Sequence, residues 1–332
     1  MSLLANECKS PRGLLAAAAL CLASVPAHAL VIVPTFDADV SADARSAFNF
    51  AANELQGLFS DPVTVNIQIS TGATGLSESV APVIFGNADT YADARARLMA
   101  DQSAYPSPDG ALSIAPNGST ASAIDPTNGG AFFYTTAQAK ALGIIPANSP
   151  GIDGTFSYNS TLSYVFDPAH RAGLPGQFDF ITLAEHEVTE IMGRITGLGG
   201  NVCANRNCGP DFTPLDLFRF TAPGVHALSD VAGAYFSIDN GATRLRTFNF
   251  AGTNGGDPHD WDSSDPNDPF NAFIAAGIAH ALSPADITAL DVIGWDNAAA
   301  IAAIPEPDTY AMLLAGLGVL GVIARRRKSE IA

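Results

Sequence analysis

Hydrophobic patterning predicts an α+β fold with two lobes and a cleft between them. Strand, helix, strand, helix and short-strand patterns come first, one long helix at 180–194 follows, and the remaining chain is largely irregular. The composition agrees, because 47% hydrophobic and 15% charged residues can form a sizeable core. We expect the long helix to line the cleft.

The N-terminal half begins with a strand at 30–36 and an amphipathic helix at 41–59, which places Phe48, Leu55 and Phe59 on one face. Further elements before the long helix are expected at 62–70 (strand), 90–99 (helix), 135–142 (helix), 154–159 (strand) and 162–166 (strand), with long loops over 101–130. The 154–159 strand is either an edge strand along which an extended peptide lies or an ordinary strand of the sheet.

The long helix at 180–194 is the most regular helical pattern, and glycines at 197, 199 and 200 end it. A strand is expected at 214–220 and an Asp-rich loop at 257–268. A closing helix at 283–292 carries a capping signature, with Ser283 as cap, Pro284 first and Asp286 third.

Residues 1–29 have the pattern of a secretory signal peptide. Arg12 precedes an apolar run at 14–23, and Ala27-His28-Ala29 is the small-x-small site that a signal peptidase cleaves. The alternative, a buried apolar helix, lacks a charged stop-transfer flank. The mature chain is therefore expected to begin at Leu30.

The C-terminal segment 304–332 contains Pro305-Glu306-Pro307, an apolar stretch at 310–324 and a basic cluster at 325–328. The stretch is expected to form a transmembrane helix whose basic end stays inside. These three elements resemble the PEP-CTERM sorting signal of Gram-negative bacteria; a plain membrane anchor is the alternative. The resemblance implies recognition by an exosortase, removal of the tail, and delivery to the cell surface or extracellular matrix. One domain at 30–303 remains.

The charge of this domain argues against nucleic acid as a partner. Each terminal segment carries a net charge of +1, so their removal takes the net charge of −17 to about −19. A nucleic-acid partner requires a basic surface, which a chain this acidic does not provide.

Two cysteines, Cys203 and Cys208, remain in the mature domain. In an oxidising compartment such a pair most simply forms a small disulfide loop. A zinc-binding pair is the alternative, although metal-binding cysteine pairs usually come with a second pair.

The long helix also carries the candidate chemistry. At roughly 100° per residue, His186 and Glu190 fall on one face one turn apart, so that both can hold one metal ion. Glu187 lies a quarter turn aside, where its carboxylate can take a proton from a water beside the ion. The alternative, an acidic helix face with an incidental histidine, is disfavoured because so apolar a helix buries these charges.

The run from Phe178 to Glu187 resembles the helix region of zincin metalloproteases, and 186–194, 215–220 and 289–295 resemble predicted PEP-CTERM metalloproteases. The resemblance implies a zincin-like fold and metal-dependent hydrolysis of protein or peptide substrates, with His186 as a ligand of one zinc ion and Glu187 as catalytic base. Glu190 replaces the usual second histidine, and Thr196 stands where a third would be.

A third ligand must then come from elsewhere, and Asp216 is the first choice. The reserve candidates are Asp211, His226, His170 and His259. Arg194 is expected to pair with Asp216 or Asp179.

For the acidic loop and for the whole domain, the sequence leaves two alternatives each. The loop 257–268 either binds calcium through its carboxylates or is a solvated acidic loop. The whole domain is either a secreted endopeptidase or a non-catalytic extracellular matrix or biofilm protein with a degenerate or structural metal site.

Overall fold

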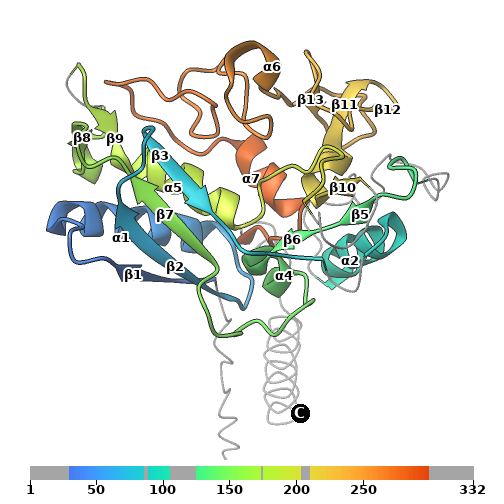
Figure 1. Cartoon of the computed structure of the whole chain (residues 1–332), viewed down its shortest axis with the longest axis horizontal. Coiled ribbons are helices and arrows are strands. Elements are labelled where there is room, and N and C mark those ends of the chain that lie inside the picture. The colour runs from blue at the N-terminus through green and yellow to red at the C-terminus, as the bar shows by residue number, and fades with distance from the viewer. Residues whose placement is uncertain (1–29, 86–88, 105–124, 173–174, 203–209, 299–332) are drawn as a thin grey trace, which may run out of the picture.

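The computed structural model describes residues 30–85, 89–104, 125–172, 175–202 and 210–298 (Figure 1). The expected signal peptide, the expected disulfide of Cys203 with Cys208, and the C-terminal segment lie outside these residues. Within the described ranges, no helix has both the length and the apolar character needed to cross a bilayer. The described part mixes helices with several small sheets, which confirms the α+β class. The two-lobed, zincin-like arrangement stays a prediction.

A four-stranded sheet forms the centre of the N-terminal half. Its strands are β1 (Val31–Phe36), β2 (Thr64–Thr71), β7 (Gly154–Tyr158) and β3 (Ser77–Val80), in that spatial order (Figure 1). The first three run parallel, and β3 pairs with β7 antiparallel. Strand 154–159 is therefore an interior strand, and β3 takes the edge position considered for it.

Two helices pack against the same face of this sheet, α1 (Ala42–Leu58) and α5 (Phe180–Ile191). Phe156 of β7 marks that face, because its ring stacks on Phe48 of α1 at 5.9 Å and meets Phe180 of α5 edge-on at 5.7 Å. The alternating apolar residues of β2 are buried on this side as well. The aromatic cluster thus fixes α5 against the sheet.

Local sequence sets the ends of α5. The Asp179 carboxylate caps it by accepting from the Ile181 backbone N–H at 3.1 Å. The helix ends three residues earlier than expected, because Gly193 takes a φ of 112°, which favours glycine. Gly154 allows close approach to the sheet, since a Cβ there would lie 2.5 Å from Ile191 Cγ1.

The other expected elements are found, with bounds that differ by up to five residues, the largest change being the end of the 90–99 helix at Ala104. They are α2 (Tyr91–Ala104), α4 (Thr136–Ala141), β8 (Tyr164–Val165) and α7 (Pro284–Asp291). The capping box of Ser283 and Asp286 at α7 is present. The expected strand at 214–220 is wrong in its first part, which is a 3-10 helix (Pro214–Phe218), because Pro214 and a Thr213–Asp216 capping box start a helical turn.

Short elements complete the fold. A second sheet has the order β12 (Val225–His226), β11 (Arg219–Ala222), β13 (Tyr235–Phe236) and β14 (Arg246–Thr247). Three two-stranded pairs are formed by β4 (Val83–Ile84) with β6 (Tyr134–Thr135), β5 (Ala131–Phe132) with β10 (Asp211–Phe212), and β8 with β9 (Phe178–Asp179). The helical turns η1 (Pro168–His170) and α6 (Ala251–Asn254) lie in the connections.

A buried ion pair ties α4 to the main sheet and gives a test of the fold. Lys140 Nζ donates to Asp153 Oδ2 at 2.6 Å and to the Thr64 carbonyl oxygen at 2.9 Å, and the two side chains of the pair are 1% and 3% exposed. Replacing Lys140 with Met is expected to lower the free energy of unfolding by about 3–5 kcal/mol, because it leaves a buried carboxylate uncompensated. Urea unfolding of the exported protein measures this loss.

The matched control removes both charges. Lys140→Met combined with Asp153→Leu is expected to recover most of the stability, since no unpaired charge remains buried. A single variant that unfolds at the wild-type urea midpoint contradicts this role of the pair.

Candidate metal centre

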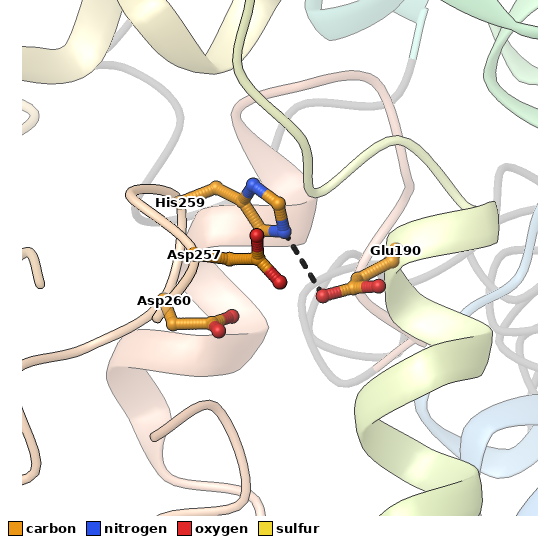
Figure 2. A group of neighbouring side chains, drawn as sticks. All are labelled: Glu190, Asp257, His259 and Asp260. Carbon is orange, nitrogen blue, oxygen red and sulfur yellow. Dashed lines mark hydrogen bonds and ion pairs between the residues drawn. The ribbon is translucent and has the colours of Figure 1, made fainter. Parts of the chain in front are cut away.

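Three side chains converge beside the C-terminal half of α5. His186 and Glu190 lie one turn apart on this helix, with His186 Nε2 3.2 Å from Glu190 Oε1. His259 comes from the loop after α6 and places its Nε2 2.9 Å from the same oxygen (Figure 2). Both imidazoles therefore approach one carboxylate oxygen, and all three residues are largely buried.

The orientation of His186 leaves Nε2 available as a ligand atom. Its Nδ1 lies 2.7 Å from the Pro269 carbonyl oxygen, which can only accept, so Nδ1 carries a proton. Burial opposes charge on this ring, but the carboxylates of Asp260 and Glu190 outweigh it and raise the pKa of His186 to about 10. The same negative field attracts a divalent cation, which competes with that proton.

A buried arginine compensates part of this acidity. Arg194 is 0% exposed; its Nη1 donates to Asp260 Oδ1 at 2.6 Å, and Nη2 lies 3.5 Å from Glu190 Oε1. Its guanidinium also covers the Phe270 ring at 4.2 Å. The expected pairing of Arg194 with Asp216 or Asp179 is wrong, because the 257–270 loop brings Asp260 closer.

Glu187 lies beside this group and faces β3. Its side chain hydrogen-bonds with those of Ser77 and Glu190, while Ser79 Oγ donates to Glu190 Oε2 at 2.6 Å. Burial and the neighbouring charge of Glu190 raise the pKa of Glu187 to about 8. Burial also opposes the charge of Glu190, but hydrogen bonds and attraction from His186 and His259 lower its pKa well below the usual range. The two carboxyl groups therefore differ in protonation at neutral pH.

The donor set fits a zinc ion. Two imidazole nitrogens and one carboxylate oxygen are ligands that zinc commonly takes in catalytic sites. Ligand atoms of Glu190, Asp257, His259 and Asp260 lie within 4.8 Å of one another, close enough to surround one cation. His186 is outside this group of four and approaches Glu190 Oε1 through its Nε2 at 3.2 Å. Asp260 is held by Arg194, so it serves as an outer partner of this set.

Asp216, the first choice for the third ligand, is placed elsewhere. Its Oδ2 accepts from the backbone N–H groups of Thr213 at 2.8 Å, Gly197 at 2.9 Å and Leu198 at 3.2 Å. This carboxylate instead fixes the turn after α5 to the start of the 3-10 helix, which is a structural role.

Of the four reserve candidates, His259 contacts α5, through the Glu190 carboxylate. The other three lie in other parts of the described fold. His170 is exposed and pairs with Asp167 at 2.8 Å. His226 lies in the second sheet with its ring 4.4 Å from that of Phe220, and burial lowers its pKa to about 4. Asp211 lies in β10, paired with β5.

The acidic loop 257–268 mostly makes turns. Carboxylate oxygens of Asp262, Asp265 and Asp268 each accept from a backbone N–H two residues later, at 2.9–3.1 Å. Arg246 also pairs with Asp265 and Asp268. These contacts favour a structural loop over a calcium site, and calcium binding stays an untested prediction.

The comparison with protein families concerns the C-terminal tail. Residues 303–328 match the PEP-CTERM protein-sorting motif. The PEP-CTERM motif implies recognition by the exosortase sorting machinery, and it indicates an exported protein that is sorted through the membrane. No curated protein and no solved structure matches the chain. Because the PEP-CTERM match lies far from α5 in sequence, the candidate metal centre rests on its own geometry.

Proposed function

We propose that the exported domain is a zinc-dependent peptidase with a zincin-like, two-lobed fold that acts at the cell surface or in the extracellular matrix. His186, Glu190 and His259 hold the ion, and Glu187 is the general base. The observation that carries this proposal is the convergence of two imidazole Nε2 atoms on Glu190 Oε1, at 3.2 and 2.9 Å. Such a set of three ligands leaves one position open. A zinc ion bound there stabilises negative charge and makes a neighbouring water more acidic.

The residues around this set have distinct tasks. Glu187 takes the proton of the attacking water and passes it to the leaving amine. A divalent cation beside it would lower its raised pKa and so favour the ionised form that accepts a proton. The Pro269 carbonyl oxygen keeps His186 in the required tautomer. Arg194 offsets the charge of Asp260 and so limits the excess of negative charge around the ligands.

The edge strand β3 supports a peptide as substrate. It ends the four-stranded sheet, and its Ser77 and Ser79 side chains contact Glu187 and Glu190. An extended peptide that adds to this edge through main-chain hydrogen bonds would pass beside both carboxyl groups. This arrangement favours peptides over substrates that cannot pair with a strand.

A second candidate is the non-catalytic matrix protein. It is favoured by the Arg194–Asp260 ion pair and the His259–Glu190 contact, which satisfy much of the polar cluster through protein contacts alone. In that case the same residues would hold the 257–270 loop against α5 without a cation.

Metal content and metal removal separate the two candidates. We expect the exported protein, purified without chelator, to contain about one zinc ion per chain, which is the capacity of a single three-ligand site. We expect EDTA to abolish its hydrolysis of casein and added zinc to restore it. Plasma emission spectrometry and a casein assay measure both. A protein that stays free of zinc at micromolar zinc, or cleaves casein equally well in EDTA, contradicts the peptidase.

A further inference from the structure

Asp257 differs from the other carboxylates of the metal centre in being exposed and unrestrained. Figure 2 shows its carboxylate beside the His259 ring and directed toward Glu190. A carboxylate oxygen of Asp257 lies within 4.8 Å of the ligand atoms of Glu190, His259 and Asp260. Among the described residues, no hydrogen-bond donor reaches this carboxylate. Asp260 contrasts with it, because Asp260 is 2% exposed and accepts from Arg194 at 2.6 Å.

The backbone around Asp257 is held on both sides. Immediately after it, the Pro258 carbonyl oxygen accepts from the buried Arg219 at 2.5 Å. Immediately before it, the Gly256 N–H donates to Asn254 Oδ1 at 3.0 Å, and the Asp257 carbonyl oxygen accepts from Asn249 at 3.2 Å. The Asp257 carboxylate can therefore turn away by rotation of its own side chain, without displacing the backbone or His259.

The number of ligands decides whether a zinc site is open to substrate. Three protein ligands leave a zinc site open, whereas four close it, as in structural zinc sites. A second carboxylate also neutralises the charge of the ion and weakens it as a Lewis acid. A carboxylate within 4.8 Å of the ligand atoms of Glu190 and His259, yet hydrogen-bonded by none of the described residues, is suited to act as the fourth.

We propose that Asp257 is a releasable fourth ligand, which closes the metal centre when it binds and opens it to solvent and substrate when it withdraws. The inference rests on the proposed function, because it needs an ion at His186, Glu190 and His259. The arrangement in Figure 2, with Asp257 directed toward Glu190, corresponds to the closed form. A peptide bound along β3 competes with Asp257 for the fourth coordination position of the ion.

The experiment compares the exported wild-type protein with Asp257→Ala and Asp262→Ala. Asp262 is the matched control, because it is an exposed aspartate of the same loop that lies outside the metal group and accepts from the Ser264 backbone N–H. Zinc affinity is measured by competition with a chromophoric chelator. Visible absorption of the cobalt-substituted proteins, with and without azide, reports whether a coordination position is open.

We expect Asp257→Ala to lower zinc affinity by about 10- to 100-fold and to make the cobalt spectrum respond to azide. Wild type and Asp262→Ala are expected to bind zinc equally well and to show little response to azide. Hydrolysis of casein by Asp257→Ala at saturating zinc is expected to exceed that of wild type.

Other results separate the inference from the proposed function. Unchanged zinc affinity in Asp257→Ala, or an azide response in wild type as large as in that variant, overturns the fourth-ligand role alone. Loss of affinity in Asp257→Ala without casein hydrolysis by any variant supports the ligand and overturns the peptidase. A wild-type protein that binds no zinc overturns both.

Discussion

Replacing Glu187 with Gln is expected to lower kcat for peptide hydrolysis by about 10²- to 10⁴-fold while zinc remains bound, because the amide cannot take the proton of the attacking water. The side chain is nearly isosteric, and Ser77 can still hydrogen-bond to its oxygen. Since Glu187 is not among the three proposed ligands, zinc affinity should change little. Steady-state hydrolysis of a fluorogenic peptide, together with zinc content, measures both effects.

The control for this variant is Glu78→Gln on β3. Glu78 is exposed and lies between Ser77 and Ser79, so the substitution removes the same charge close to the site without touching the proposed base. We expect wild-type kcat in Glu78→Gln. If Glu187→Gln keeps wild-type kcat with zinc in place, the role of Glu187 as base is wrong.

The sequence was sufficient to predict the helix that carries the site, because its signals are local. Residues 180–192 contain more apolar side chains than an exposed helix carries, which predicts a buried helix. In α7, the capping residues Ser283 and Asp286 lie three positions apart, a spacing that can be recognised in the sequence. The one-turn spacing of His186 and Glu190 follows from helix geometry alone, and the structure brings their side chains to 3.2 Å.

The proposed third ligand, His259, could not be chosen from the sequence, because its position beside α5 depends on tertiary packing. His259 is 69 residues from Glu190, and it lies in a loop whose Asp260 pairs with Arg194 and whose Pro258 carbonyl oxygen accepts from Arg219. Asp216 is the first choice because several zincin groups take their third ligand from an acidic residue some way beyond the helix. Thr213 and Pro214, however, form a capping signal that already accounts for its carboxylate. A histidine between Asp257 and Asp260 in one loop is the sequence signal that could have raised His259 above the other reserve candidates.

A substitution at His259 tests the proposed third ligand directly. Replacing His259 with Ala is expected to lower zinc affinity by more than about 100-fold, because changes to residues behind the ligands already cost about 10- to 100-fold. Hydrolysis should be lost at micromolar zinc. Chelator competition and the peptide assay measure the two, and a His259→Ala protein that keeps wild-type zinc affinity contradicts its assignment as a ligand.

Replacing Asp216 with Ala should show whether this carboxylate is a metal ligand or stabilises the turn after α5. It removes the acceptor of three backbone N–H groups, so the free energy of unfolding is expected to fall by at least about 1–3 kcal/mol. Zinc affinity of the folded protein should stay within a few-fold of wild type, because this carboxylate points into the turn after α5. Urea unfolding in EDTA isolates the structural cost, since no bound ion then contributes to stability. If Asp216→Ala instead unfolds like wild type in EDTA and loses zinc, the ligand is Asp216, and the convergence of His259 on Glu190 is only a contact between the loop and the helix.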